Sequence, residues 1–280
     1  MNIANGRYTA VSLALLLALT GCGESTSSTQ GDGFNNNGDQ GTVTEPTTFD
    51  EEQLVANLVD NVITPAYTLF YNQSVAQVSA IEDYCALEQQ SVESSSDNAL
   101  TAMADAQNAW LNAMGAWQQV EMMQIGPLLD NNAELRNRIY SWPAISRCGI
   151  DQDVVYHQDT IINKDPERPY DISARTATRR GLFALQHVLF NEQYDHHCSV
   201  ANDALADWNS RTVLARKVAR CEYAITAADD VVASAQELLD KWQGDNGFAA
   251  QLKTAGQPES QFENAHEALN RISDAMFYLT

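Results

Sequence analysis

Apolar side chains recur every three or four positions through most of the chain after residue 49, the spacing that places them on one face of an α-helix. Asp50 is suited to cap the first of these helices, which runs toward Tyr84 with an interruption at Pro65. No stretch shows the alternation of polar and apolar residues that is typical of a β-strand. The pattern therefore predicts an all-α protein, a bundle of up-and-down helices.

Residues that cap or end helices divide the first half of the pattern. The SSSD stretch at 94–97 separates the first helix from a second, which ends at Gly126-Pro127. A shorter helix covers roughly 132–141 and stops at Trp142-Pro143, because the residue before a proline disfavours the helical conformation. Residues 149–172 read mostly as loop.

The second half contains three further predicted helices. Ser173 is suited to cap a helix that ends near Asn191. Ser210 is suited to cap a long helix that continues to Trp242. Pro258 is suited to be the first residue of a last helix, which has Phe262, Leu269, Ile272 and Met276 on its inward face.

The first 48 residues read as targeting sequence rather than as part of the bundle. Residues 1–21 combine an early positive charge, a short apolar run and the tetrapeptide LTGC, which resembles the lipobox of a bacterial lipoprotein signal peptide. Cys22 is then the lipidated first residue of the mature protein and its anchor in a membrane. Residues 22–48 are rich in Gly, Ser, Thr and Asn and predict a flexible tether, which leaves 49–280 as the folded domain.

The net charge limits the classes of partner that are expected, and the residue after the lipidation site indicates the membrane. The chain has 37 acidic and 16 basic residues, so a nucleic acid is not an expected partner. Gly23 follows Cys22, where retention at the inner membrane would favour aspartate. By resemblance to Gram-negative lipoproteins, the protein is expected on the periplasmic face of the outer membrane.

Four cysteines follow the lipobox, at positions 85, 148, 198 and 221. An even number in an oxidising compartment predicts two disulfides, with three connectivities open. We favour Cys198–Cys221, because a turn at residues 208–210 would bring them together, and Cys85–Cys148 as the remaining bridge.

Three of the five histidines lie in the stretch RGLFALQHVLFNEQYDHHC. His187 has no carboxylate three or four residues away on its predicted helix, so we interpret it as a structural or surface residue. His196 and His197 lie beside Cys198 in a predicted loop. Adjacent histidines point in different directions and seldom bind one metal ion together, so a metal site there is not favoured.

Two other pairs of residues, each with one histidine and one carboxylate, resemble parts of metal or catalytic sites. His266-Glu267 begins like the zinc motif H-E-x-x-H, but the second histidine is replaced by Asn270. Asp153 and His157 are four residues apart in a predicted loop, and we interpret them as a solvated pair.

A set of residues in order along the chain resembles the imelysin family of bacterial periplasmic proteins, also classified as M75 peptidases, over about residues 50–280. The set comprises Trp117, Gly126-Pro127, Arg138-Ile139, Trp142-Pro143, Arg180-Gly181-Leu182-Phe183-Ala184-Leu185-Gln186 and Leu189-Phe190. The resemblance implies two related four-helix bundles and a link to iron uptake. It also implies that relatives continue past a segment like Ala275–Leu279, so the chain would be a shortened member with about one and a half bundles.

The family motif, G-x-H-x-x-E, is altered here at both of its metal-binding positions. Gly181 is present, but the histidine is Phe183 and the glutamate is Gln186. Phenylalanine cannot bind a metal ion, and a neutral amide is a weak ligand and no general base. The motif therefore supports neither iron nor zinc as a cofactor, and no catalytic residue is assigned. Gln186, with Arg180 and Glu121, is expected to line a cleft for a polar ligand.

The favoured function is a non-enzymatic, imelysin-like envelope lipoprotein that acts as a binding or scaffold component with envelope protein partners, in a pathway such as iron acquisition. Two alternatives remain. The first is a metal-dependent peptidase of the M75 type, which the altered motif disfavours. The second is a carrier of divalent or ferric cations that uses acidic surface residues.

Overall fold

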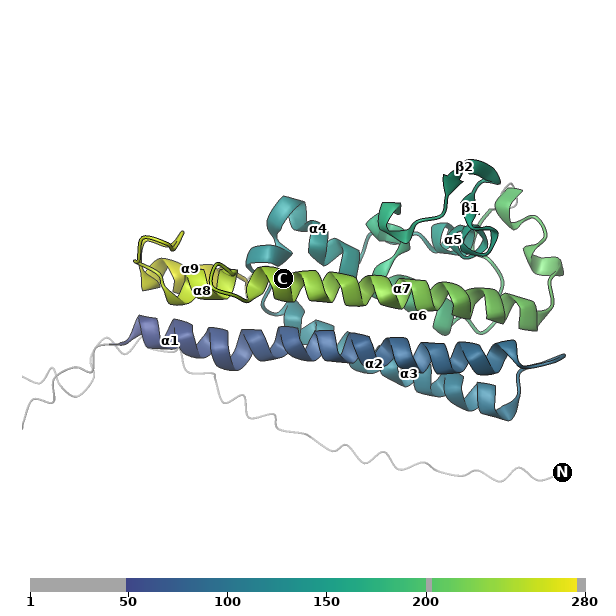
Figure 1. Ribbon diagram of the computed structural model, residues 1–280, viewed down its shortest axis with the longest axis horizontal. Coiled ribbons are helices and arrows are strands. Elements are labelled where there is room, and N and C mark those ends of the chain that lie inside the picture. The colour runs from purple at the N-terminus through teal and green to yellow at the C-terminus, as the bar shows by residue number, and fades with distance from the viewer. Residues whose placement is uncertain (1–48, 200–202, 276–280) are drawn as a thin grey trace, which may run out of the picture. The chain divides into compact units, whose positions relative to one another are not determined.

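Three long helices run side by side through the part of the chain that the computed structural model describes, residues 49–199 and 203–275 (Figure 1). They are α2 (Thr64–Gln89), α3 (Asp97–Glu121) and α7 (Val213–Trp242), and α2 packs against both of the others. The core between them is rich in alanine and aromatic side chains, including the fully buried Trp117 and Trp242. The all-α prediction is confirmed.

The first predicted helix and its interruption are observed. Asp50 caps α1 (Glu51–Leu58), because its side chain accepts a hydrogen bond from the backbone N–H of Gln53 at 2.9 Å. A π-helical turn, η2 (Val59–Ile63), separates α1 from α2, which has Pro65 in its first turn. A proline has no N–H to donate to the preceding turn, so the α-helical bonding pattern breaks at this point.

The chain between α3 and α7 forms shorter elements beside the long helices. They are η3 (Gly126–Leu128), α4 (Asp130–Ile139), α5 (Arg147–Asp159), β1 (Ile161–Ile162), β2 (Asp165–Pro169), η4 (Ile172–Ala174), η5 (Ala177–Arg179), α6 (Gly181–Leu189), η6 (Asp203–Leu205) and η7 (Trp208–Ser210). The two strands pair as a small antiparallel hairpin. The predicted loop over 149–172 is therefore wrong for its first half, where α5 buries Ile150 and Val154 together with Asp151 and Asp153. These buried carboxylates interrupt the apolar pattern and hid the helix.

The predicted helix from Ser173 to Asn191 begins later than expected. Asp171, not Ser173, caps the turn η4, by accepting a hydrogen bond from the backbone N–H of Ser173 at 2.8 Å. The backbone then becomes extended at Arg180, and α6 begins at Gly181, whose φ is +75°. A left-handed residue cannot continue a helix from the preceding turns, so the helical stretch is split.

Two further starting points differ from the predictions. Thr212 rather than Ser210 caps α7, through a bond from the N–H of Ala215 at 3.1 Å. After α8 (Phe248–Lys253), the last helix α9 (Ala265–Ala275) begins at Ala265 rather than Pro258. The predicted inward position of Met276, the signal peptide and the tether lie outside the described residues.

Two disulfides are present, but their pairing differs from the one favoured from the sequence. Cys85 on α2 bonds Cys221 on α7, and Cys148 on α5 bonds Cys198 in the loop after α6. The turn at Trp208–Ser210 does reverse the chain, but it lays α7 along α2 rather than returning it to Cys198. The predicted pairing was wrong because it joined Cys198 to the cysteine nearest to it in the sequence, Cys221.

The buried disulfide between α2 and α7 is expected to stabilise the bundle. Cys85 and Cys221 are 136 residues apart, and each is 1% exposed. Replacing both by serine removes a long-range cross-link, and we expect the free energy of unfolding to fall by about 3 kcal/mol. Urea denaturation followed by circular dichroism measures the change. An unaltered midpoint would contradict this role.

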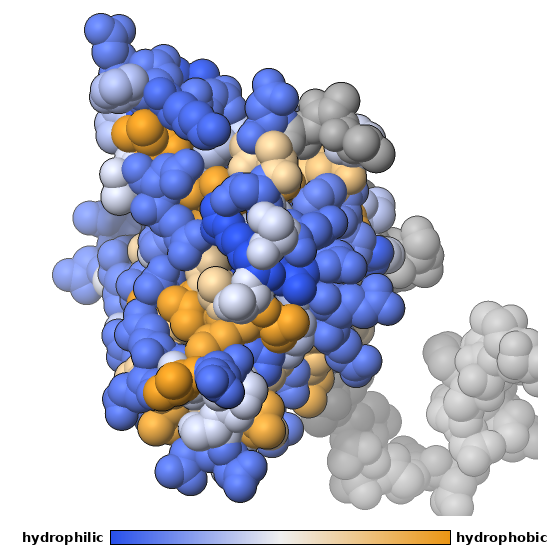
Figure 2. Space-filling model, turned by 90° about the vertical axis from the view of Figure 1, so that its right-hand side faces the viewer, coloured by the Kyte–Doolittle hydropathy of each residue, from blue (hydrophilic) through white to orange (hydrophobic). Residues whose placement is uncertain are grey.

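Among the described residues, no helix combines the length and apolar character needed to span a membrane. The surface at the end of the domain that includes the β-hairpin is mostly hydrophilic, with hydrophobic residues between the polar ones (Figure 2).

Candidate functional site

Helix α6, which includes the altered motif, is held between α3 and α7. The indole N–H of Trp110 on α3 donates to the carbonyl of Leu182 at 2.8 Å, and the amide of Gln107 donates to the carbonyl of Leu189 at 2.8 Å. From α7, the hydroxyl of Tyr223 donates to the carbonyl of Arg179 at 2.7 Å. Both ends of α6 are therefore fixed by side chains from its neighbours, of which Trp110 and Tyr223 are buried and Gln107 is half-buried.

Gly181 allows this packing. Its φ of +75° lies in the left-handed region, and a Cβ at this position would overlap the carbonyl oxygens of Arg138 and Ile139 at the end of α4. Only glycine tolerates both the conformation and the approach of the α4 backbone. The motif glycine thus has a structural role, independent of metal binding.

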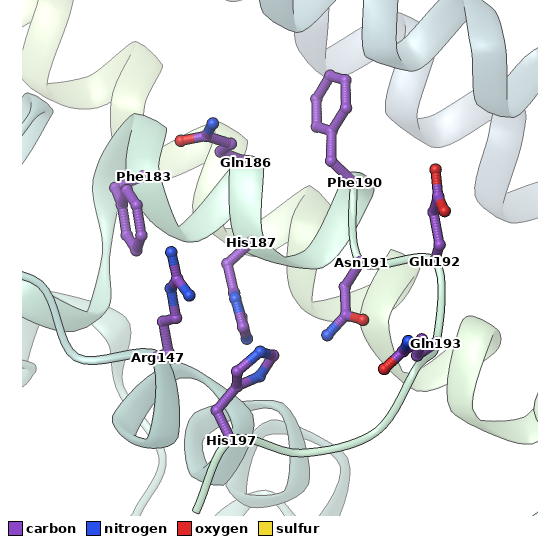
Figure 3. Close-up of a pocket in the computed structure, with 9 residues that line it drawn as sticks. All are labelled: Arg147, Phe183, Gln186, His187, Phe190, Asn191, Glu192, Gln193 and His197. Atoms are coloured by element: carbon purple, nitrogen blue, oxygen red, sulfur yellow. The ribbon is translucent and has the colours of Figure 1, made fainter.

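A cavity of about 380 Å³ lies between α6, the start of α5 and the loop after α6 (Figure 3). Phe183 and Gln186, the two altered motif positions, both line it. Phe183 is buried and Gln186 is exposed. Asn191 and Gln193 contribute further amide groups from the loop.

Arg147 brings a positive charge to this cavity. Figure 3 shows its side chain reaching from α5 toward α6, on the side of His187 and His197. Within the described ranges, its guanidinium makes no ion pair or hydrogen bond, unlike most other arginines of the domain. Glu192 also lines the cavity, but its side chain points away from His197 (Figure 3). The cavity therefore offers an available cation with amide donors nearby.

Asp151, His187 and His197 meet at the inner side of the same cavity. The Nε2 atom of His187 lies 2.9 Å from one carboxylate oxygen of Asp151. The other oxygen accepts the backbone N–H of His197 at 2.7 Å and lies 3.4 Å from its Nδ1. One potential ligand atom from each residue lies within 4.8 Å of the others. His187 is therefore buried rather than at the surface, and it has a carboxylate partner that its own helix did not indicate.

Asp151 is charged in this environment. Burial disfavours its charged form, but hydrogen bonds from His187 and the His197 backbone, together with the charge of Arg220, outweigh burial and hold the pKa of Asp151 below its ordinary value. Arg220 Nη2 lies 3.4 Å from Asp151, and burial in turn lowers the pKa of Arg220. The cluster thus contains a carboxylate that is ionised at neutral pH.

The other two predicted cleft residues lie elsewhere. Arg180 is 4% exposed and forms an ion pair with Asp230 on α7, so it supports the bundle and does not line this cavity. Glu121, at the end of α3, is also absent from the lining. Burial raises the pKa of Glu121, against the opposing effects of Trp117 and Arg136.

Asp153 and His157 are not the solvated pair that was predicted. Both lie on α5, where Asp153 is fully buried and accepts hydrogen bonds from Arg175 and Arg179. The Nε2 atom of His157 lies 2.9 Å from the hydroxyl of Thr226 on α7. The prediction failed because it assumed a loop. His266 is exposed, and its Nδ1 atom lies 2.8 Å from a carboxylate oxygen of Glu51.

Sequence reasoning missed Arg147 and Asp151. Their contacts with α6 come from a helix that begins more than 30 residues earlier, so no local spacing reveals them. The positions of the cysteines were the one feature of the sequence that could have indicated these contacts. Pairing Cys148 with Cys198 would have placed Asp151, one helical turn after Cys148, beside His197.

Comparison with known proteins relates the chain to one family. The family model described as Imelysin (Peptidase_M75) matches residues 63–280. None of the curated proteins compared with the chain matches it.

Two solved structures share the fold. One, described as an iron-regulated protein A precursor from Parabacteroides distasonis, is 18% identical with a TM-score of 0.54, and the match covers 82% of this chain and 57% of that one. An imelysin-like protein from Psychrobacter arcticus shows the same identity and TM-score, with 82% of this chain and 59% of the other covered. The chain thus spans less than two thirds of the length of either structure.

Proposed function

Because the chain belongs to the imelysin family, we propose that it is a non-catalytic binding protein of the bacterial envelope, anchored through Cys22, whose cavity beside α6 binds a small carboxylate-bearing ligand. The observation that supports this most is the side-chain chemistry of the cavity. Where the family motif has histidine and glutamate, this cavity has Phe183 and Gln186, and a cation, Arg147, lies near them.

This set of residues does not fit the metal ion that the family motif implies. Phe183 offers no donor atom, and the amide of Gln186 has no charge to attract a cation. Replacing an anionic ligand by a neutral amide beside an arginine instead favours an anion. Arginine binds carboxylates through two parallel N–H donors, and the nearby amides add donors of their own.

The proposed location in the envelope and the proposed link to iron acquisition are supported by features outside the cavity. The LTGC tetrapeptide at residues 19–22 favours a lipoprotein. The name of the Parabacteroides distasonis protein links that protein to regulation by iron. Iron is commonly complexed by carboxylates, because hard cations prefer oxygen ligands, so a carboxylate-binding protein is suited to iron acquisition.

Arg147→Ala is expected to weaken the binding of citrate, used as a tricarboxylate probe, about tenfold or more, because a charge-assisted hydrogen bond is lost. Isothermal titration calorimetry on residues 49–280 measures the affinity. Arg168→Ala is the matched control, because Arg168 is an exposed arginine on β2 outside the cavity. Equal affinity in the wild type and both variants, or no saturable binding by the folded wild type, would disprove carboxylate binding here.

A further inference from the structure

The cluster at the inner side of the cavity has the composition of a metal site. Two imidazole nitrogens and one carboxylate oxygen are a common ligand set for zinc and for iron(II), with further positions open to water or a ligand. His187 and His197 come from α6 and the following loop, and Asp151 comes from α5. None of the three occupies a position of the family motif.

The spacing is close to what a bound ion requires. Ligand atoms about 2.0–2.1 Å from a tetrahedral zinc ion lie about 3.3 Å from one another. One carboxylate oxygen of Asp151, Oδ1, lies 2.9 Å from Nε2 of His187, and the other, Oδ2, lies 3.4 Å from Nδ1 of His197. One ligand atom from each of the three residues lies within 4.8 Å of the others, so a small adjustment brings the set to this spacing. Because the His197 side chain is 40% exposed, it can rotate slightly to complete the geometry.

The loop that carries His197 is fixed in place by a covalent bond. Cys198, the next residue, is bonded to Cys148, which lies one turn before Asp151 on α5. The backbone N–H of His197 also donates to Asp151. The cluster is therefore largely formed before any ion binds, which reduces the ordering that binding requires.

Arg220 opposes a cation at this position, because its Nη2 lies 3.4 Å from Asp151. Other contacts hold its guanidinium, which donates to the carbonyl of Asp195 at 3.0 Å and lies over the rings of Tyr194 and Trp208. Arg220 approaches only Oδ1 of Asp151, the oxygen that also faces His187, and makes no contact with Oδ2, the oxygen that faces His197. The effect of Arg220 is to lower the affinity, so binding is expected at micromolar rather than nanomolar concentrations.

We propose that Asp151, His187 and His197 form a binding site for one divalent transition-metal ion, with zinc and iron(II) as the best-suited ions. The site lies beside the altered motif and does not use residues 183 and 186. This inference goes beyond the proposed function and does not depend on it, because Arg147 is not among the three ligands.

Calorimetric titration of Zn²⁺ into residues 49–280 tests the site, with the visible absorption of bound Co²⁺ as a second readout of the ligands. We expect one saturable site, and His197→Ala is expected to weaken Zn²⁺ binding at least tenfold and to change the Co²⁺ spectrum. His197 is half-exposed, so this variant should fold, which circular dichroism checks.

His196→Ala is the matched control, because His196 is the adjacent histidine and lies outside the cluster. It should bind Zn²⁺ like the wild type. Equal losses in both variants, no binding by the folded wild type, or weak binding at many sites that His197→Ala leaves unchanged would each overturn the proposal. Arg147→Ala separates the two proposals, because it should weaken citrate binding and leave Zn²⁺ binding intact.

Discussion

Gly181→Ala is expected to lower the free energy of unfolding by about 4 kcal/mol or to prevent folding, although it adds only one methyl group. The new Cβ would overlap the carbonyl oxygens of Arg138 and Ile139, and a φ of +75° would be strained for alanine. Neither backbone can move easily, because α6 is bonded at both ends to α3 and α4 ends at this point. Urea denaturation followed by circular dichroism measures the loss.

Gly115→Ala is the matched control. Gly115 lies inside α3, and a Cβ there would meet nothing within 4 Å. Because alanine favours a helix more than glycine does, this variant should be more stable by about 0.5–1 kcal/mol. If both glycine variants changed stability alike, the clash with α4 would not be the cause.

Gly181 and the two residues that follow it in the motif are under different structural constraints. Gly181 is required by the meeting of two backbones, whatever the chemistry of the site. Phe183 and Gln186 line a cavity, where side chains can change without altering the path of the chain. The fold therefore requires glycine at position 181, whereas the side chains at positions 183 and 186 set the chemistry of the cavity.

The long helices could be predicted from the sequence because one apolar face determines each of them. The cap at Asp50 and the capping stretch at 94–97, in which Ser96 caps α3, were also recognisable, because these side chains bond within three residues. Helix α5 was missed since Asp151 and Asp153 occupy its buried face. Their partners lie more than 20 residues away, and no periodicity in the chain can reveal them.

The candidate site could be predicted only in part for the same reason. The resemblance to the family motif identified residues 183 and 186, which line the cavity together. The Asp151–His187 contact joins residues 36 positions apart, and the disulfide pairing that would have revealed it was wrongly assigned. Contacts between elements, rather than within them, were the ones that sequence reasoning could not supply.

Asp230→Ala is expected to destabilise the bundle by about 3–5 kcal/mol, because it leaves the charge of Arg180 buried without its partner. The two side chains are 4% and 6% exposed. Arg180 donates through Nε to Asp230 at 2.7 Å and through Nη1 to the carbonyl of Ser173 at 2.9 Å. The ion pair joins the residue before α6 to the middle of α7. It therefore both neutralises the buried charge of Arg180 and holds the start of α6 in position.

A double-mutant cycle separates the charge from the packing. Arg180→Met combined with Asp230→Ala removes both charges, so this double variant should be more stable than Asp230→Ala alone. Asp207→Ala, which breaks the more exposed pair with Arg211, is the control and should cost about 0.5 kcal/mol or less. The cycle also includes Arg180→Met alone. If the double variant lost as much stability as Asp230→Ala and Arg180→Met lose together, the unpaired buried charge would not be the source of the instability. Arg180 would then stabilise α6 through packing alone.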